Sequence, residues 1–404
     1  MSVALPLAGL RVLDFCWIGA GALVTKTLAE LGAEVYRVES HTHPDNLRLT
    51  PPFRPGAEGL EGSGYFASRN STKQSVAINM ATQRGREIAF ELATKVDVVT
   101  SNFRPGIMKR WGFTYEEVCA VNPGVIYLTM PMQGSAGPHS TFIGFGSTIS
   151  ALAGLVNLSG KPGRVPVGTG THYPDHVPNP GHALVAMLAA IRHARKTGEG
   201  QEIELSQFES TVNVIGPAIL EASLGQQPVA TGNRTDDAVP NGVFQASDRS
   251  WIVLSCHTDE HWLALLDVLG LGELATDARF ATVPDRKNNE DELEALVGAA
   301  AFRRERTELL VALDASGIPN APVNSSRDIV EHPVLWDRGF WQNVQHPVIG
   351  EMPISRTPFR MVGHEQFTLV RPPLLGEHTL DVLSRELGMT AEEHDRLVEE
   401  KVLY

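Results

Sequence analysis

The sequence has few cysteines and no pair of them. Its three cysteines, Cys16, Cys119 and Cys256, lie far apart along the 404 residues. This pattern excludes a disulfide framework and the paired-cysteine spacing of structural zinc sites, and it favours a reducing cytoplasm. No other spacing of His, Cys, Asp or Glu is typical of a metal site, so we expect no metal.

Excess positive charge and long apolar runs are also missing. The chain has 34 Lys and Arg residues against 47 Asp and Glu residues, a formal net charge of −13 at pH 7. Such a chain is a poor ligand for nucleic acid or an anionic membrane, although a local basic pocket can still bind a small anion. No apolar stretch approaches the length of a bilayer span, and the first residues lack a secretory signal pattern. We expect a cytoplasmic protein.

Apolar runs and helical patterns alternate along the first third of the chain. This alternation predicts an α/β fold with a doubly wound parallel sheet, whose ligands bind where the strands end. The loops after Phe15, Glu39, Met80 and Asn102 are therefore the first candidates for a site. The predicted strands are 10–16, 34–39, 75–80, 97–102 and 124–130, and the predicted helices include 25–31 and 83–96.

The pattern changes near residue 230, which indicates a second, smaller domain. Before it, we predict a helix that Asn179 caps and that Gly198 ends, followed by a single helix over 204–225. The length of 404 residues is consistent with two domains. The expected boundaries are 1–222 for the first part of a large domain, 223–328 for a small domain, and 329–404 for the return of the chain to the large one.

The turn after the first strand is similar to a dinucleotide-binding fingerprint. Gly19 and Gly21 follow the strand, and Glu39 ends the next strand about twenty residues later. The third glycine of the fingerprint is replaced by Val24, and bulky Trp17 stands where a pyrophosphate needs open backbone. The motif therefore disfavours NAD, and the two glycines by themselves indicate a tight turn.

Several stretches, in order, resemble the family III CoA transferases, also called the CaiB/BaiF family. They are "LAGLRVLDF", "LAELGAEVYRVE", the block from Tyr65 to Met130 around "NFRPG", "AAIRHARKTGEGQEIELSQFES", "GIPNAPV" and "LLGEHTLDVLSRELG". The resemblance implies a Rossmann-like large domain with a parallel sheet, built from both ends of the chain, and a small α+β domain from the middle. It further implies an interlocked, ring-like homodimer, or a heteromer with a similar subunit. Acyl-CoA and a carboxylic acid would be the substrates, with no permanently bound cofactor.

The resemblance places a nucleophilic carboxylate at Asp175, in "GTHYPDHVPNPGHALVAML". Such a carboxylate attacks the acyl-CoA thioester to form a mixed anhydride and then carries CoA as an enzyme thioester. Asp175 also precedes the helix that we expect Asn179 to cap, where a helix dipole favours negative charge and would keep the carboxylate ionised. The other interpretation is an Asx-turn residue without catalytic duty.

The residues around Asp175 and in the glycine-containing loops supply further candidates, and the resemblance assigns CoA contacts. Gly144 and Gly146 are candidate oxyanion donors, and His172, Tyr173 and His176 are candidate substrate contacts, although the two histidines also fit as polar loop residues. Arg110 fits a phosphate ligand or an exposed helix charge. The CoA-binding set is Trp17, Ile18, Ala20, Ile78, Asn102, Phe103, Arg104, Arg110 and Trp111.

Departures from the family pattern leave some roles open. Formyl-CoA transferase has basic residues where this chain has Ser40 and Ala81, so the phosphate contacts are expected from Arg37, Arg48, Lys73 or Arg104. The stretch "GNRTDDAVPNG" is not glycine-rich, unlike the loop that covers the site in the family, so its role in shielding the site from water stays open. Two rival functions stay open: an acyl-CoA racemase, whose histidine base is replaced here by Phe145, and a non-catalytic subunit of a heteromeric transferase.

Overall fold

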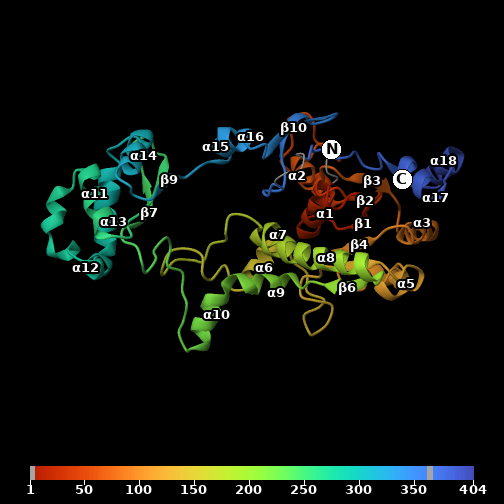
Figure 1. Cartoon of the computed structure of the whole chain (residues 1–404), viewed down its shortest axis with the longest axis horizontal. Helices are drawn as coiled ribbons and strands as arrows, with labels where there is room; N and C mark the ends of the chain where they lie inside the picture. The colour runs from red at the N-terminus through yellow and green to blue at the C-terminus, as the bar shows by residue number, and fades with distance from the viewer. Residues whose placement is uncertain (1–4, 362–366) are drawn as a thin grey trace. The chain divides into compact units, whose positions relative to one another are not determined.

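The computed structural model describes residues 5–361 and 367–404. Within the described residues, backbone contacts divide the chain into two compact units (Figure 1). The larger unit comprises residues up to 156, 168–226 and 333–404, and the smaller unit comprises 157–167 and 227–332. No signal in the sequence indicated that the short segment 157–167 belongs with the smaller unit.

A six-stranded parallel sheet forms the centre of the larger unit, in the order β3-β2-β1-β4-β5-β6. The chain order reverses between β1 and β4, so the loops that follow these two strands diverge and open a crevice. The α/β fold and its first five strands are confirmed, whereas β6 was not predicted. The strands are β1 (Arg11–Phe15), β2 (Glu34–Glu39), β3 (Gln74–Ala77), β4 (Val98–Ser101), β5 (Ile126–Thr129) and β6 (Gln201–Glu204).

Helices cover both faces of this sheet. Successive residues of a strand point to opposite faces, so Val12 packs in one core and Leu13 in the other. The core around Val12 includes α1 (Ala20–Glu30) and α8 (Pro178–Thr197). The core around Leu13 includes residues of other helices, among them α3 (Gln83–Ala93), α5 (Tyr115–Val121), α17 (Thr379–Leu387) and α18 (Ala391–Glu399).

Two helix predictions are wrong, one at the beginning of the helix and one along its length. Helix α8 begins at Pro178 after Val177, because proline needs no backbone partner in a first turn; Asn179 is therefore inside the helix and is not its cap. The single helix expected over 204–225 is interrupted. After β6 come α9 (Gln207–Val212), a 3₁₀ turn at Asn213–Ile215 and α10 (Gly216–Ser223), which has Pro217 in its first turn.

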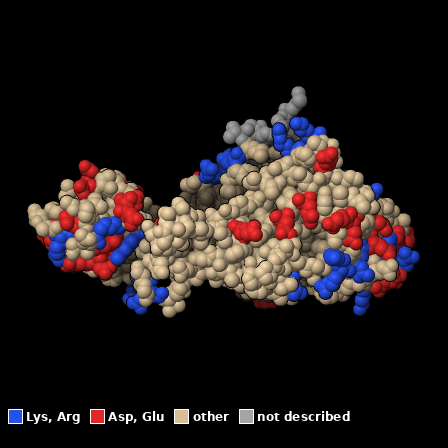
Figure 2. Space-filling model, turned by 90° about the horizontal axis from the view of Figure 1, so that it is seen from below, with Lys and Arg blue, Asp and Glu red and all other residues tan. Residues whose placement is uncertain are grey.

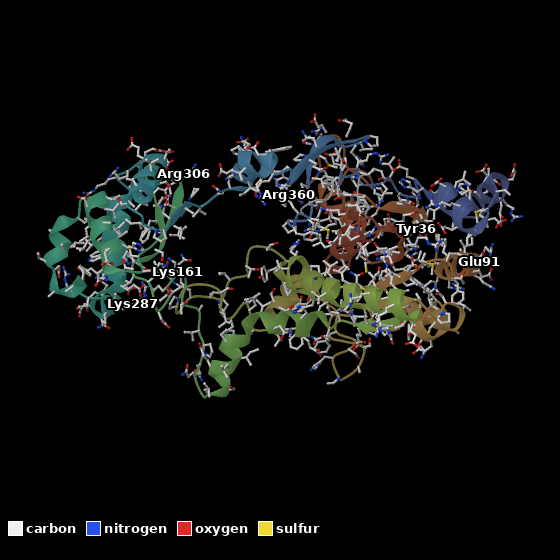
Figure 3. The ribbon with its side chains drawn as sticks, viewed as in Figure 1. Tyr36, Glu91, Lys161, Lys287, Arg306 and Arg360 are labelled. Atoms are coloured by element: carbon white, nitrogen blue, oxygen red, sulfur yellow. The ribbon has the colours of Figure 1, made fainter. Side chains whose placement is uncertain are left out.

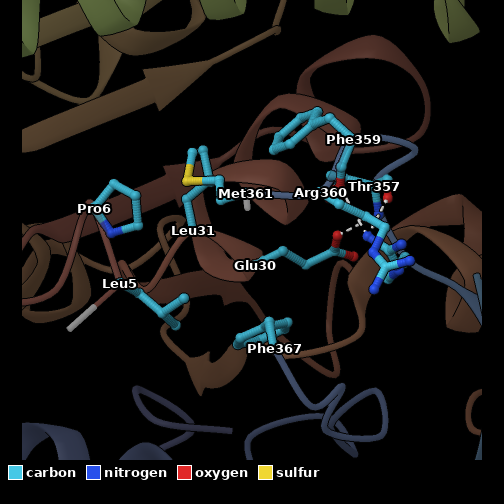
Figure 4. A pocket seen from close by; sticks show the side chains of 10 residues that line it. Leu5, Pro6, Glu30, Leu31, Thr357, Phe359, Arg360, Met361 and Phe367 are labelled. Carbon is cyan, nitrogen blue, oxygen red and sulfur yellow. Dashed lines mark hydrogen bonds between the residues drawn. The ribbon is translucent and has the colours of Figure 1, made fainter. Parts of the chain in front are cut away.

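Short elements complete the larger unit. They are η1 (Asn46–Leu49), α2 (Gly64–Asn70), α4 (Ile107–Arg110), α6 (Gly146–Leu152), α7 (Tyr173–His176), α16 (Pro333–Asp337) and an antiparallel hairpin of β10 (Trp341–His346) and β11 (Gly350–Ser355). A small cavity of about 50 Å³ lies beside α1. There Glu30 accepts a hydrogen bond from the backbone N–H of Thr357, which ties the segment after β11 to α1 (Figure 4).

The smaller unit has its own sheet and core. Its antiparallel sheet contains β7 (Asn241–Gln245), β8 (Trp251–Ser255) and β9 (Asn320–Pro322). Trp262 and Phe280 pack against each other in its core. Its helices are η3 (Gly272–Thr276), η4 (Ala278–Phe280), α11 (Asp259–Leu269), α12 (Val283–Asn288), α13 (Glu290–Ala301), α14 (Arg306–Ala315) and α15 (Ser326–Val330).

Charged side chains of both signs gather in groups on the face that Figure 2 shows, and broad stretches between these groups carry neither sign. Both signs occur on each unit, in agreement with a modest excess of acidic residues spread over a large surface. Among the described residues, no helix combines the length and the apolar character needed to cross a bilayer.

Candidate active site

One pocket of about 640 Å³ lies where the parallel strands end. All four loops expected to carry the site contribute to its lining, because β1, β2, β3 and β4 are neighbours in the sheet and point the same way. Segments from later in the chain, which include Gly144 and Asp175, complete its lining. The sequence-predicted residues in its lining are Trp17, Ile18, Ala20, Ile78, Asn102, Phe103, Arg104, Trp111, Gly144 and Asp175.

Other predicted residues lie outside this lining. Arg110 is exposed on α4, and its role as a phosphate ligand stays a prediction. Gly146 is absent from the lining but contacts the carboxyl group of Asp175. The candidate substrate residues His172, Tyr173 and His176 lie in and beside α7, around Asp175.

Asp175 lies at the edge of the pocket on α7, with 8% of its surface exposed. Its carboxyl group lies between Gly19, at the start of α1, and Gly146, at the start of α6. A methyl group added to Gly19 would lie 3.0 Å from Oδ2, and one added to Gly146 would lie 2.7 Å from it. A methyl group at Gly146 would force the carboxylate to move, and one at Gly19 would make a tight contact with it.

Burial raises the pKa of Asp175 to about 6, while His172, the backbone N–H of Gly146 and Arg69 oppose this rise. The carboxylate is therefore mostly ionised at pH 7, although less acidic than an exposed aspartate. The backbone N–H that donates to this carboxylate belongs to Gly146 at the start of α6. Asp175 is itself in the short helix α7, two residues before Val177, which caps α8, and the stabilising effect of the dipole of α8 stays a prediction.

The loop after β1 is held by its neighbours in the sheet. The Asn102 amide makes two hydrogen bonds to Trp17, accepting from its N–H at 2.9 Å and donating to its carbonyl at 2.6 Å. Asn102 therefore orients this loop with its amide, in addition to lining the pocket. Ile18 has a φ of 64°, which is rare for a β-branched residue, and its N–H donates to Asp45.

Beneath this loop lies a network of buried charges. Arg37 pairs with Asp45 and also donates to the carbonyl of Cys16 at 2.7 Å. Arg48 pairs with Glu39, and Lys73 pairs with Asp14 at 3.2 Å. The expectation that Arg37, Arg48 or Lys73 binds a CoA phosphate is wrong, because all three side chains are fully buried and already have carboxylate partners.

The network makes a testable contribution to stability. Replacing Asp45 with Asn removes the closest counter-charge of buried Arg37, so we expect the free energy of unfolding to fall by about 3 kcal/mol. Urea unfolding of the wild-type chain and of the Asp45→Asn variant measures this change. The matched control is Glu91→Gln, in an exposed ion pair with Arg84 on α3 (Figure 3), where we expect a change within about 1 kcal/mol. Equal effects of the two variants would contradict the prediction.

Aromatic side chains form one wall of the pocket. Phe103 contacts both Trp17 and Trp111 edge to face, with ring centroids 5.1 Å and 5.6 Å apart. Arg104 is exposed at the same wall, and among the described lining residues it is the one arginine or lysine. His43 also lines the pocket. Sequence reasoning missed His43, although its place shortly after β2 was an available signal.

Arg69, on α2, is a further residue that sequence reasoning missed. Its Nη2 lies 2.7 Å from Nδ1 of His176, and its charge lowers the pKa of Asp175. No spacing connects residue 69 with residue 175, so only the packing of α2 near α7 reveals this contact. Among the described residues, no group of three or more His, Cys, Asp or Glu side chains could hold a metal ion.

The chain is similar to proteins of one family over nearly its whole length. A sequence model described as CoA-transferase family III matches residues 7–379. A probable CoA-transferase of Mycobacterium tuberculosis, Rv1866, is 33% identical over 99% of this chain, which spans 50% of that protein. A succinyl-CoA–D-citramalate CoA-transferase of Chloroflexus aurantiacus is 29% identical over 98% of each chain. The crystal structure of a CaiB/BaiF family protein from Brucella suis has a TM-score of 0.88 and 31% identity, covering 95% of this chain and 100% of that one.

Proposed function

Since the chain belongs to CoA-transferase family III, we propose that it moves CoA between two carboxylic acids through covalent intermediates on Asp175. The observation that carries this proposal is the place of the Asp175 carboxylate. It is buried between two glycines at the edge of the pocket where the parallel strands end. A nucleophile in such a place reaches a ligand in the pocket and is shielded from bulk water.

The first half of the reaction loads the enzyme with CoA. A carboxylate oxygen of Asp175 attacks the thioester carbonyl carbon, the C–S bond breaks, and CoA leaves as a thiolate. The thiolate then attacks the Asp175 carbonyl carbon of the mixed anhydride. A C–S bond forms, a C–O bond breaks, and the donor acid leaves as a carboxylate. The enzyme now carries CoA as a thioester.

The second half transfers CoA to the acceptor. The acceptor carboxylate attacks the Asp175 thioester carbon and expels the CoA thiolate, which forms a second mixed anhydride. The thiolate then attacks the acceptor carbonyl carbon, and the electron pair of the broken C–O bond returns to Asp175. No water is consumed and no net proton is released, so the enzyme returns to its starting state.

Neighbouring groups support these steps. The N–H of Gly146 donates a hydrogen bond to the Asp175 carboxyl group and can stabilise negative charge on its oxygens. Gly144, which lines the pocket, is our candidate for a second backbone N–H donor to an oxyanion. Arg104, which is exposed in the lining of the pocket, is our candidate ligand for a phosphate of CoA. The aromatic wall of Trp17, Phe103 and Trp111 offers apolar contact area to the rest of the thioester.

The pocket offers less to a racemase. Proton transfer on both faces of an α-carbon needs two bases, and the position that the resemblance assigns to the second base holds Phe145. Phe145 lines the pocket with 57% of its surface exposed, and its ring cannot accept a proton. This side chain supports a transferase over a racemase.

Trapping the enzyme thioester tests the proposal. The purified chain is mixed with a panel of acyl-CoA donors beginning with succinyl-CoA, quenched in acid and analysed by intact-mass and peptide spectrometry. We expect a mass increase of one CoA less one water, located on Asp175. If no donor gives an adduct and ¹⁸O from labelled water enters the released acid, the protein is a hydrolase and the proposal fails.

The pH profile reports on the same carboxylate. Only ionised Asp175 attacks the thioester, and its pKa is about 6, so kcat/KM is expected to fall about tenfold for each pH unit below this value. Above pH 7 we expect kcat/KM to be independent of the ionisation of Asp175, because this carboxylate is already ionised. Circular dichroism at pH 5 shows whether the chain stays folded. An acid limb centred near pH 4 in a folded chain would contradict the raised pKa.

A further inference from the structure

Arg69 is a largely buried cation whose contacts do not neutralise it. Its Nη2 donates to His176, its guanidinium lies 5.2 Å from the ring centre of Tyr65, and its buried Nε has no hydrogen-bond partner. In the part of the chain that the structure describes, these contacts include no ion-paired carboxylate. Burial lowers the pKa of Arg69, as expected for a guanidinium that has lost water without gaining a close counter-ion.

His176 holds this guanidinium as a neutral acceptor. Burial, Arg69 and His172 together lower the pKa of His176 to about 4, so its Nδ1 carries a lone pair at neutral pH and accepts from Arg69. His176 follows Asp175 in α7, which places the cation beside the carboxylate. The charge of Arg69 acts on Asp175, and Lys26 of α1 is also close enough for Arg69 to lower its pKa. Lys26 is itself paired with Glu30 at 3.4 Å.

The charge balance around Arg69 changes during the proposed reaction. In the free enzyme the negative charge of Asp175 partly offsets the guanidinium. In the enzyme thioester Asp175 is neutral, so Arg69 becomes a buried cation with no opposite charge nearby, an arrangement that is costly. An anion is then favoured beside it. The reactant required at that moment is a carboxylate, which the planar N–H groups of a guanidinium match in shape.

We propose that Arg69, oriented by His176, binds the carboxylate of the acid that attacks the Asp175 thioester. This inference rests on the proposed function. The bound carboxylate oxygen forms a bond to the Asp175 carbonyl carbon while the C–S bond breaks and CoA leaves as a thiolate. Arg69 is not among the residues that line the main pocket, so in this proposal the acid and CoA contact different groups of residues around Asp175.

The experiment compares two nucleophiles on the preloaded thioester. Wild-type and Arg69→Gln chains are loaded from an acyl-CoA, desalted, and then discharged with succinate, with acetate or with hydroxylamine. Hydroxylamine is uncharged near pH 7.5 and needs no cation. We expect R69Q to lower the second-order rate of discharge by both carboxylates about 100-fold, equivalent to about 2.7 kcal/mol, and to leave discharge by hydroxylamine within about twofold.

Two variants make the test specific. Arg69→Lys keeps the charge but loses the planar fork, so we expect a loss of about tenfold with carboxylates; it also serves as the test if R69Q does not fold. Arg195→Gln removes an exposed arginine of α8 that bonds the Pro6 carbonyl, and it should leave every rate unchanged.

The outcomes separate the possible failures. If R69Q slows hydroxylamine as much as carboxylates, Arg69 supports the structure of the site and does not bind the acid. If neither nucleophile is slowed, the proposal is overturned. If even the wild-type chain cannot be loaded with CoA, the proposed function has failed before Arg69 is tested.

Discussion

The Asp175→Asn chain is expected to fold normally and to lose at least about 10⁴-fold of its transferase rate. An amide has nearly the shape of the carboxylate, so no cavity forms between Gly19 and Gly146. Its oxygen, however, is a far weaker nucleophile and cannot be converted into an anhydride that returns to a free carboxylate. Steady-state rates with the best donor and acceptor measure the loss, and intact-mass spectrometry after donor treatment should show no CoA adduct.

The fold of this variant provides the internal check. Burial disfavours the charged form of Asp175, as its raised pKa indicates. The neutral amide of asparagine should therefore not lower the melting temperature. Asp381→Asn is the matched control, because Asp381 lies in an exposed pair with Arg385 on α17, away from the pocket. The control should keep wild-type activity. An Asp175→Asn chain with more than a hundredth of wild-type activity would show that another residue carries CoA.

Adding one methyl group at Gly146 is expected to lower kcat about 100-fold. The new carbon would lie 2.7 Å from Oδ2 of Asp175 and 2.9 Å from Cβ of His172, so the carboxylate must move from its present position. Such a displacement of a reacting group lowers the rate of the reaction by about two orders of magnitude. Gly19→Ala, whose methyl group would lie 3.0 Å from the same oxygen, should act in the same direction with a smaller loss. Single-turnover formation of the CoA adduct measures both.

Gly181→Ala is the matched control for these variants. Gly181 lies in α8, just after the segment that holds Asp175, and a methyl group there would meet no heavy atom within 4 Å. Alanine also favours a helix over glycine by about 1 kcal/mol, so this variant should melt no lower than wild type and keep its activity. Normal adduct formation in Gly146→Ala would mean that the carboxylate tolerates displacement.

Prediction from the sequence was most successful where a pattern is local. The apolar runs at β1, β2 and β4 have the length and flanking turns of buried parallel strands, and neighbouring parallel strands necessarily end at one edge. The loops after Phe15 and Asn102 therefore meet at the pocket, as expected. The same reasoning failed for Asn179, because capping preference is weaker than the ability of Pro178 to begin a helix one residue earlier.

Charged residues were the hardest to assign. Arg37, within β2, and Arg48, in η1, were expected as phosphate ligands, yet their side chains pair with buried carboxylates. Arg69 gave no signal, although it approaches Asp175. Whether a cation pairs with a carboxylate or faces a ligand depends on residues that are distant in sequence, and periodicity carries no information about them.

The sequence by itself determined the type of fold, the family and the stretch that contains Asp175, because short-range periodicity and ordered motifs are properties of neighbouring residues. The tertiary structure alone decided the environment of Asp175. The close approach of Gly19 and Gly146, the raised pKa, and the cation held by His176 all arise from segments that meet only when α1, α2, α6 and α7 pack together. Burial and charge pairing are set by such long-range contacts, and they control the reactivity of a carboxylate.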